Sequence, residues 1–194
     1  MYEIKRGGHA DMKRIYPMMK YDFKDWERPS LMECQVALLK GAELLLLKDE
    51  NGFECGYALM LRDRAHRYAL LGWLGVYPTV RGGGIGSEFL ELIKARYAKY
   101  DCVFLEVTEY PELDKARRLV EFYRRHGWQE TGVPYTIGGR DTLLMHQGSA
   151  PQRTDLKAVM EAIYAPMYGP VAFRKNIGIE YQRARKGSFF VPSF

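Results

Sequence analysis

The stretch between residues 68 and 97 constrains the fold of this chain more than any other. Residues Tyr68 to Val76 are almost all apolar, which predicts a buried strand. A glycine-rich turn follows, and the next apolar side chains recur at spacings of three and four, as on one face of a helix: Ile85, Phe89, Leu92, Ile93 and Tyr97. The order of strand, glycine turn and helix predicts an α/β fold.

The turn Arg81-Gly82-Gly83-Gly84-Ile85-Gly86 places backbone donors where a ligand can reach them. Consecutive glycines adopt positive φ without steric cost and let the backbone come close to a ligand. The first N–H groups of the following helix have no intrahelical partner and lie at the positive end of the helix dipole. The turn therefore predicts a phosphate-binding site.

Two common phosphate-binding motifs do not fit this turn. A Walker A loop ends in Gly-Lys-Ser/Thr, but Gly86 is followed by Ser87, and the next lysine is Lys94. A dinucleotide fingerprint requires a third glycine or alanine, and Ser87 stands at that position. A phosphate-loop nucleotide hydrolase is therefore disfavoured.

The spacing that does fit is Arg/Gln-x-x-Gly-x-Gly/Ala, which Arg81, Gly84 and Gly86 satisfy. With this pattern the chain resembles the GCN5-related N-acetyltransferase (GNAT) family. A second apolar run, Cys102 to Val107, and a helix over 113–125 come next in the expected order. The helix ends in Phe122-Tyr123-Arg124-Arg125-His126-Gly127-Trp128, which resembles the family's second signature. The resemblance covers roughly residues 2 to 147.

The resemblance implies acetyl-CoA as co-substrate, with no metal. In the family, the loop amides hold the pyrophosphate, and the end of the preceding strand pairs with the pantetheine and donates an N–H to the thioester oxygen. Arg81 either adds charge near the phosphates or lies in solvent, and Ser87 either donates to a phosphate or caps the helix. The implied cofactor-binding residues are Leu74, Gly75, Val76, Arg81, Gly82, Gly83, Gly84, Ile85, Gly86 and Ser87.

Tyr123 matches the family tyrosine that gives its phenolic proton to the departing CoA thiolate. A core position is the alternative, because Leu119, Val120 and Tyr123 share one helical stripe.

Glu106 is the candidate base that removes a proton from the acceptor amine. Strand alternation places it on the face opposite Val103, Leu105 and Val107, and a carboxylate within an apolar strand requires an explanation. Leu-Glu-Val here resembles the corresponding strand of protein N-terminal acetyltransferases. Ala116, however, replaces the asparagine usual in that subgroup, and a salt-bridged or solvent-facing Glu106 is the alternative.

The acceptor site is expected in the segment that links the first two helices, because the family's acceptor groove lies there. Carboxylates among aromatic rings would attract a cationic amine, partly through cation–π contacts. A solvated loop with aromatic anchors is the alternative. The candidate substrate-binding residues are Asp22, Phe23, Asp25, Trp26 and Glu27.

The whole pattern predicts an α/β class with a mixed, mostly antiparallel central sheet of about six to seven strands flanked by helices, the acyl-CoA N-acyltransferase fold. Met12, Ile15, Tyr16 and Met19 predict one buried helical stripe, and Ser30 with Glu33 forms a capping box for a helix over 30–40. Asn51-Gly52 predicts a hairpin between the runs 43–48 and 53–61. Two further strands are expected over 128–133 and 141–147.

The predicted division is a GNAT domain over residues 1–148 and a C-terminal helical extension over 149–194. Thr154 is the predicted cap of one helix whose apolar stripe comprises Leu156, Val159, Met160 and Ile163. The basic and aromatic tail, residues 181–194, is expected to pack on the domain or on a second subunit, with Phe189, Phe190 and Phe194 as anchors. A homodimer through this extension is therefore possible, and nucleic-acid binding is disfavoured because no reader motif is present.

Bulk properties agree with a cytoplasmic globular enzyme. The chain is 47% apolar and 27% charged, carries a net charge of +5, and contains no apolar run of membrane-spanning length or secretory h-region. The sequence thus predicts an N-acetyltransferase that uses acetyl-CoA and a primary amine of a small molecule or peptide, by direct attack in a ternary complex. The alternatives are a noncatalytic acyl-CoA sensor or interaction module, and a protein N-terminal or lysine acetyltransferase.

Overall fold

The computed structural model describes residues 1–65, 67–108 and 113–179. Within this part of the chain, nine strands form one sheet. The strands are β1 (Glu3–Gly7), β2 (Glu43–Lys48), β3 (Glu54–Arg62), β4 (Tyr68–Val76), β5 (Cys102–Thr108), β6 (Gln129–Glu130), β7 (Tyr135–Ile137), β8 (Arg140–Gly148) and β9 (Ile177–Ile179). The helices are α1 (His9–Asp22), α2 (Leu31–Leu39), α3 (Ile85–Arg96), α4 (Leu113–Arg125), α5 (Leu156–Tyr164) and α6 (Pro170–Asn176), with a 3₁₀ turn η1 at Pro78–Val80.

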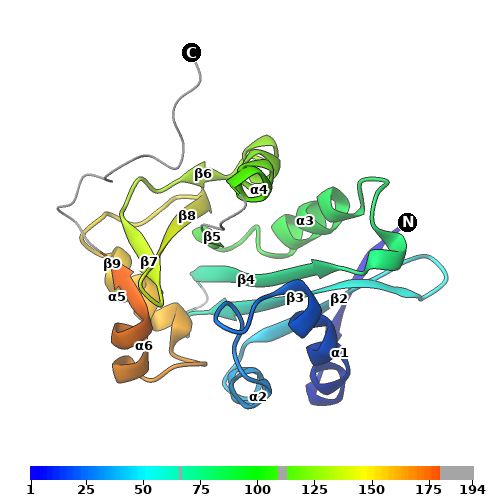
Figure 1. Ribbon diagram of the computed structural model, residues 1–194, viewed down its shortest axis with the longest axis horizontal. Coiled ribbons are helices and arrows are strands. Elements are labelled where there is room, and N and C mark those ends of the chain that lie inside the picture. Colours follow the sequence, from blue (N-terminus) through cyan, green and yellow to red (C-terminus); the bar gives the residue numbers. More distant parts are fainter. Residues whose placement is uncertain (66, 109–112, 180–194) are drawn as a thin grey trace.

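The sheet is mixed and mostly antiparallel, as the sequence predicts. Its order is β1-β2-β3-β4-β5-β8-β7-β9, with β6 paired to β8. Strands β4 and β5 are parallel, joined by the crossover through α3, and the other paired strands are antiparallel. Figure 1 shows α3 and α4 on one side of the sheet and α1 and α2 on the other.

Each face of the sheet has its own apolar core. Side chains of α1, α2, α5 and α6 pack with Leu59, Phe104 and Leu144 on one face. Side chains of α3 and α4 pack with Leu105 and Met145 on the other. Strand alternation therefore separates Phe104 from Leu105, and it assigns Glu106 to the α1–α2 side, opposite Leu105.

Local sequence signals account for most of the element boundaries. Ser30 caps α2: its hydroxyl accepts from the Glu33 amide at 3.2 Å, and the Glu33 carboxylate accepts from the Ser30 amide at 2.7 Å. The methionine-rich stripe of α1 is fully buried. The hairpin between β2 and β3 turns through Asn51 and Gly52, as predicted.

Three predictions about the second half of the chain require correction. The strand expected over 128–133 is only the two residues of β6, and the sequence reading omitted β7 and β9, which are three residues each. The cap of α5 is Asp155 rather than Thr154, and its side chain makes no capping hydrogen bond. Short strands without alternation form because a neighbouring strand pairs with them, so the local sequence carries little signal.

Residues 149–179 are part of the sheet and of its core. β9 pairs antiparallel with β7, with Ile179 opposite Tyr135, and α5 buries Leu156, Met160 and Ile163 in the core on the α1–α2 face. The division of the chain at residue 148 stays a prediction. The tail anchors Phe189, Phe190 and Phe194 lie outside the described residues, and so does any homodimer contact that they would make.

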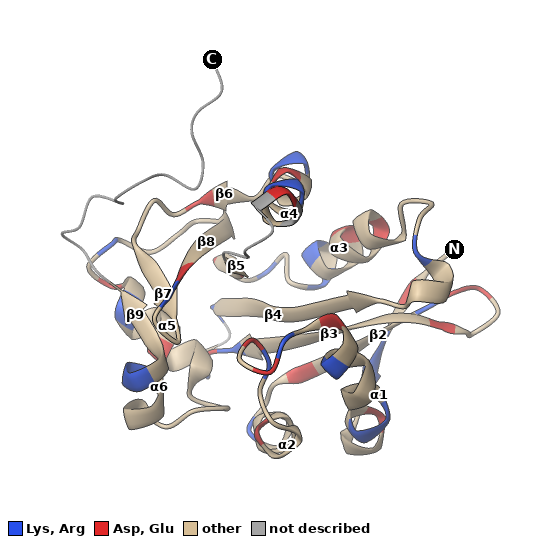
Figure 2. Ribbon diagram, viewed as in Figure 1, with Lys and Arg blue, Asp and Glu red and all other residues tan. Residues whose placement is uncertain are grey.

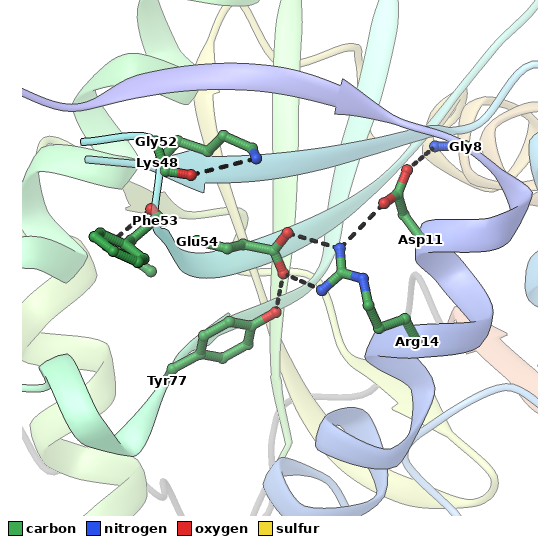
Figure 3. Close-up of polar contacts among 9 residues, drawn as sticks. Gly8, Asp11, Arg14, Lys48, Gly52, Phe53, Glu54 and Tyr77 are labelled. Atoms are coloured by element: carbon green, nitrogen blue, oxygen red, sulfur yellow. Dashed lines mark hydrogen bonds and ion pairs between the residues drawn. The ribbon is translucent and has the colours of Figure 1, made fainter. Parts of the chain in front are cut away.

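A network of ion pairs ties the start of α1 to the sheet (Figure 3). The Arg14 guanidinium donates to both carboxylate oxygens of Glu54, at 2.9 and 2.7 Å, and to Asp11 at 3.1 Å. The Tyr77 hydroxyl donates to the same Glu54 carboxylate, and the Gly8 amide donates to Asp11 Oδ2 at 2.9 Å. Because Tyr77 directly follows β4, the network fixes the point from which the chain enters the glycine turn.

Charged residues are absent from one central strand and frequent in one connecting segment. β4 carries no charged residue, whereas the segment between α1 and α2 carries two acidic and two basic residues, Lys24, Asp25, Glu27 and Arg28 (Figure 2). Within the described ranges, no helix is both long and apolar enough to cross a membrane. Cys34, Cys55 and Cys102 are free thiols, and all are buried.

Candidate active site

The site lies where β4 and β5 separate. Their parallel pairing runs from Tyr68 opposite Cys102 to Leu71 opposite Leu105 and then ends. Beyond that point β4 stays paired with β3, and β5 stays paired with β8. A register shift between Leu59 and Met60 inserts Gly72 as an extra residue in β4, and such a bulge bends the strand. The facing edges of the two strands therefore keep backbone donors and acceptors for a ligand.

A pocket of about 430 Å³ fills this gap. Its walls come from the two separated strands, α4, the first turn of α3, the segment before α2, and the residues from α5 to β9. The lining residues are Phe23, Trp26, Glu27, Arg28, Glu33, Leu71, Gly72, Trp73, Leu74, Gly86, Glu106, Val107, Thr108, Leu119, Phe122, Tyr123, Ile137, Gly138, Tyr164, Tyr168, Asn176 and Ile177.

Glu106 points into this pocket from β5, on the face that alternation predicts. Its carboxylate accepts hydrogen bonds from the hydroxyls of Tyr135 and Tyr164, the latter at 2.8 Å to Oε2 and 3.0 Å to Oε1. Burial raises the pKa of Glu106 to about 7, although both hydrogen bonds lower it. A carboxyl group with a pKa near neutrality can take a proton and release it again at physiological pH.

Tyr123 lines the same pocket from the last turn of α4 and is 8% exposed. Its ring packs edge-on against Phe122 and Trp128, with centroid distances of 5.3 and 6.2 Å. Burial raises the pKa of Tyr123 to about 12, so its hydroxyl stays protonated at neutral pH. Within the described residues, this hydroxyl forms no hydrogen bond, and it is therefore available to a bound molecule.

The glycine turn has an open backbone surface. Gly82, Gly83 and Gly84 have φ values of 101°, 60° and 80°, and no described heavy atom lies within 4 Å of the place where a Cβ would project from any of them. Among the described residues, the amides of these glycines have no acceptor. The first intrahelical bond of α3 runs from the Glu88 amide to the Gly84 carbonyl at 3.0 Å. The turn thus presents unpaired donors next to the end of the pocket that Gly86 lines.

Comparison with known proteins agrees with this geometry. A family model described as an acetyltransferase (GNAT) domain matches residues 40–130, from the C-cap of α2 to the end of β6. Residues 40–130 match a GNAT acetyltransferase domain. The predicted family resemblance is thereby confirmed. No curated protein matches the chain.

Solved structures share the GNAT fold at low sequence identity. A Bacteroides thetaiotaomicron protein assigned to the GNAT acetyltransferases has a TM-score of 0.68 and 20% identity over 86% of this chain and 98% of its own. The ribosomal-protein-S18-alanine N-acetyltransferase of Escherichia coli has a TM-score of 0.60 and 16% identity, over 78% of this chain and 97% of its own. The spermidine/spermine N-acetyltransferase of Vibrio cholerae has a TM-score of 0.57 and 15% identity, over 75% of this chain and 91% of its own. These similarities establish the fold.

The remaining residues of the predicted cofactor set lie around the turn of this GNAT domain. Leu74 lines the pocket, and Ile85 is buried beneath the first turn of α3. Gly75 packs against β3 so closely that an added Cβ would lie 2.6 Å from the Tyr57 ring. Val76 uses its carbonyl to accept from Arg81 Nε at 2.8 Å.

The two polar side chains of the turn have protein partners. A terminal nitrogen of Arg81 lies 2.6 Å from Asp22 Oδ1, so this guanidinium is held against the end of α1. Ser87 Oγ lies 3.0 Å from His126 Nε2, whose ring also contacts Glu91 at 3.1 Å. Ser87 therefore links the start of α3 to the end of α4.

The predicted acceptor residues divide into two groups. Phe23, Trp26 and Glu27 line the pocket, and Trp26 also lies under the Arg140 guanidinium, 4.4 Å from its ring centroid. Asp22 and Asp25 are not lining residues: Asp22 pairs with Arg81, and Asp25 pairs with Arg28 while remaining 94% exposed.

Sequence reasoning missed the two tyrosines that hold Glu106. Tyr135 lies in β7, a strand too short to recognise, and Tyr164 ends α5 directly after the buried Ile163. One signal was present, because a buried tyrosine requires a partner for its hydroxyl. Within the described residues, no group of three or more His, Cys, Asp or Glu side chains is arranged to hold a metal ion.

Proposed function

We propose that this chain is an acetyl-CoA-dependent N-acetyltransferase that acetylates a primary amine of a small molecule or peptide by direct attack in a ternary complex. One observation carries the proposal: a carboxyl group with a pKa of about 7, Glu106, and a protonated phenol, Tyr123, line one pocket that also reaches the first turn of α3 at Gly86. Glu106, Tyr123 and the start of α3 at Gly86 thus border one pocket, and the glycines proposed to bind phosphate directly precede α3.

The features of the turn and of β4 fit an acyl-CoA. The free amides from Gly82 to Gly84 suit a diphosphate, since helix N-termini and positive-φ glycines bind such groups. The unpaired edge of β4 at Leu74 and Gly75 suits an extended amide chain, and a fixed N–H there suits the thioester oxygen. Bound acetyl-CoA supplies an acetyl group activated as a thioester.

The two ionisable residues then move the protons. Alkylamines have pKa values near 10, so an amine must lose a proton before it attacks at neutral pH. Glu106 accepts that first proton, and the neutral amine then attacks the thioester carbon. Tyr123 donates its hydroxyl proton to the sulfur as the C–S bond breaks, and its phenolate takes the second proton from the acetylated nitrogen. Tyr123 is neutral again at the end, and Glu106 releases its proton to solvent.

The acceptor end of the pocket favours a cation. Glu27, Glu33 and Glu106 line it, and the one cation among the described lining residues, Arg28, is paired with Asp25. Trp26, Trp73 and Tyr168 add aromatic faces that attract ammonium groups. Structural neighbours include enzymes named for spermidine and for a ribosomal-protein alanine, so polyamines and peptide N-termini both belong in the acceptor panel.

Two other functions make different predictions. A noncatalytic acyl-CoA sensor would bind CoA without turnover, and the presence of Tyr123 and Glu106 in one pocket argues against it. A protein N-terminal or lysine acetyltransferase would acetylate peptides in preference to free amines.

The test is release of free thiol from acetyl-CoA in the presence of a panel of diamines, amino acids and peptides, with calorimetry for CoA binding alone. Thiol release that depends on an amine supports the proposal. CoA binding with no turnover on any amine would favour the sensor, and absence of CoA binding would reject both.

A further inference from the structure

The C-terminal segment, residues 149–179, forms one wall of the active-site pocket. Tyr164 and Tyr168 come from the end of α5 and the turn after it, and Asn176 and Ile177 come from the junction of α6 and β9. These residues lie beyond the range 40–130 that the GNAT family model matches. The pocket is therefore completed by a part of the chain that the family model does not describe.

The contact between this segment and Glu106 is direct. The Tyr164 hydroxyl lies 2.8 Å from Glu106 Oε2 and 3.0 Å from Oε1, and the Tyr135 hydroxyl donates to Oε1. Tyr135 and Tyr164 are 2% and 3% exposed, so packing holds both rings in place beside the carboxylate. β9 pairs with β7 opposite Tyr135 itself, and the C-terminal segment thus supports both donors.

We propose that Tyr164, with Tyr135, is a positioning residue that keeps the Glu106 carboxylate ionised and aimed at the acceptor amine, so that the C-terminal segment is part of the catalytic machinery. The inference rests on the proposed function, in which the proton that Glu106 accepts comes from the acceptor amine.

Two opposing effects determine whether Glu106 is ionised. Burial disfavours the ionised carboxylate, and two hydroxyl donors favour it, because a carboxylate accepts both bonds without giving up a proton. The result is a pKa of about 7. Burial and the nearby Glu106 charge raise the pKa values of Tyr135 and Tyr164 well above 10, so both stay donors and neither can replace Glu106 as the base.

A role in packing alone is the competing explanation for Tyr164. Its ring stacks on Tyr168 at 5.7 Å and lies 5.8 Å from Phe173. Tyr164→Phe keeps these ring contacts and removes only the hydroxyl, so the substitution separates the two roles.

The experiment titrates Glu106 directly, by carbon NMR of protein labelled at the glutamate side-chain carboxyl, with Glu106→Gln to assign the resonance. Each of Tyr164→Phe and Tyr135→Phe should raise the pKa of Glu106 by about one to two units, since a hydrogen bond to a charged group is of that size. The acidic limb of kcat/KM should move up by the same amount, and activity should recover at higher pH.

Tyr97→Phe is the matched control. The Tyr97 hydroxyl donates to the buried Glu43 carboxylate at 2.7 Å, at the far end of α3. This change removes the same kind of bond and should leave the Glu106 titration unmoved.

The outcomes are distinguishable from failure of the proposed function. An unchanged pKa of Glu106 in both phenylalanine variants overturns the inference. An equal loss of activity at all pH values, with the acidic limb of kcat/KM at its wild-type pH, overturns it as well. A shifted pKa of Glu106 in a protein that acetylates no amine would support the effect of the tyrosines on Glu106 and would reject the proposed acetyltransferase activity. If Tyr164→Phe fails to fold, Tyr135→Phe still decides.

Discussion

The Arg81 guanidinium lies 2.6 Å from Asp22 Oδ1, which joins the first residue of the glycine turn to the last residue of α1. Asp22 also accepts from the Tyr57 hydroxyl at 2.8 Å, and Arg81 donates to the Val76 carbonyl. The residue after Asp22, Phe23, lines the pocket. This ion pair thus connects the proposed phosphate-binding turn to the proposed acceptor side.

Asp22→Asn should weaken CoA binding modestly. Asparagine still accepts from Tyr57, but it no longer holds the Arg81 charge. Because Arg81 is 48% exposed, the pair contributes only about 0.5–1 kcal/mol, which corresponds to a two- to fivefold rise in the Kd for CoA measured by calorimetry. Asp25→Asn is the control, since Asp25 pairs with Arg28 and should leave the Kd for CoA unchanged. Tighter CoA binding by Asp22→Asn would mean that Arg81 is a phosphate ligand which Asp22 withholds.

Gly84→Ala tests the turn itself. Gly84 has φ 80°, and a non-glycine residue in this left-handed region costs about 1–2 kcal/mol. A shift of the chain to relieve this strain moves the amides that we expect to bind phosphate, so the Kd for CoA should rise at least tenfold. The measurement is calorimetric titration with CoA.

Gly52→Ala is the matched control for that change. Gly52 has φ 81° in the turn between β2 and β3, and like Gly84 it has no described atom near the added methyl group. Both variants should lose similar free energy of unfolding, but only Gly84→Ala should lose CoA affinity. Equal affinities for CoA would show that the turn does not bind the cofactor.

The sequence predicted those features that depend on neighbours along the chain. The Ser30–Glu33 capping box, the Asn51-Gly52 hairpin and the side of β5 on which Glu106 lies all follow from local patterns, and the structure contains each. The partners of Glu106 could not be predicted, because Tyr135 and Tyr164 are 29 and 58 residues away and only the packing of the sheet brings them together.

In the glycine turn, too, local features were predictable and long-range partners were not. A pattern can place Arg81 at the start of the turn, but it cannot say which way a long guanidinium side chain points. The observed partner, Asp22, is 59 residues earlier. The positive φ values of the glycines, by contrast, were predictable because the residue type permits them.

Glu54→Gln should destabilise the fold without changing the chemistry. Glu54 is only 11% exposed and accepts from Arg14 and Tyr77, so the loss of its charge should lower the free energy of unfolding by about 1–2 kcal/mol. Burial raises the pKa of Glu54, but the bonds from Arg14 and Tyr77 outweigh it and hold the pKa below its usual value.

The sign of the pH dependence follows from that lowered pKa. A carboxyl group whose folded pKa is depressed stabilises the fold above its unfolded pKa and loses this effect as the pH falls through the folded pKa. The difference in urea unfolding free energy between wild type and Glu54→Gln should therefore be full at pH 7 and vanish at acid pH. A difference that stays constant down to acid pH would mean that shape, not charge, is responsible.

Tyr123→Phe tests the proposed acid. The ring contacts with Phe122 and Trp128 remain, so the melting temperature should change little, while kcat should fall by about 100-fold, the lower range for general acid catalysis. The KM for acetyl-CoA should stay close to wild type, because the hydroxyl acts when the C–S bond breaks. Since burial raises the pKa of Tyr123 to about 12, wild-type activity should show no basic limb from this residue below pH 10. An acetyl donor whose leaving thiol is more acidic needs less help from a proton donor, so the loss in the variant should shrink with such a donor. Unchanged turnover in Tyr123→Phe at every pH would leave Tyr123 with a packing role and leave the thiolate to be protonated by water.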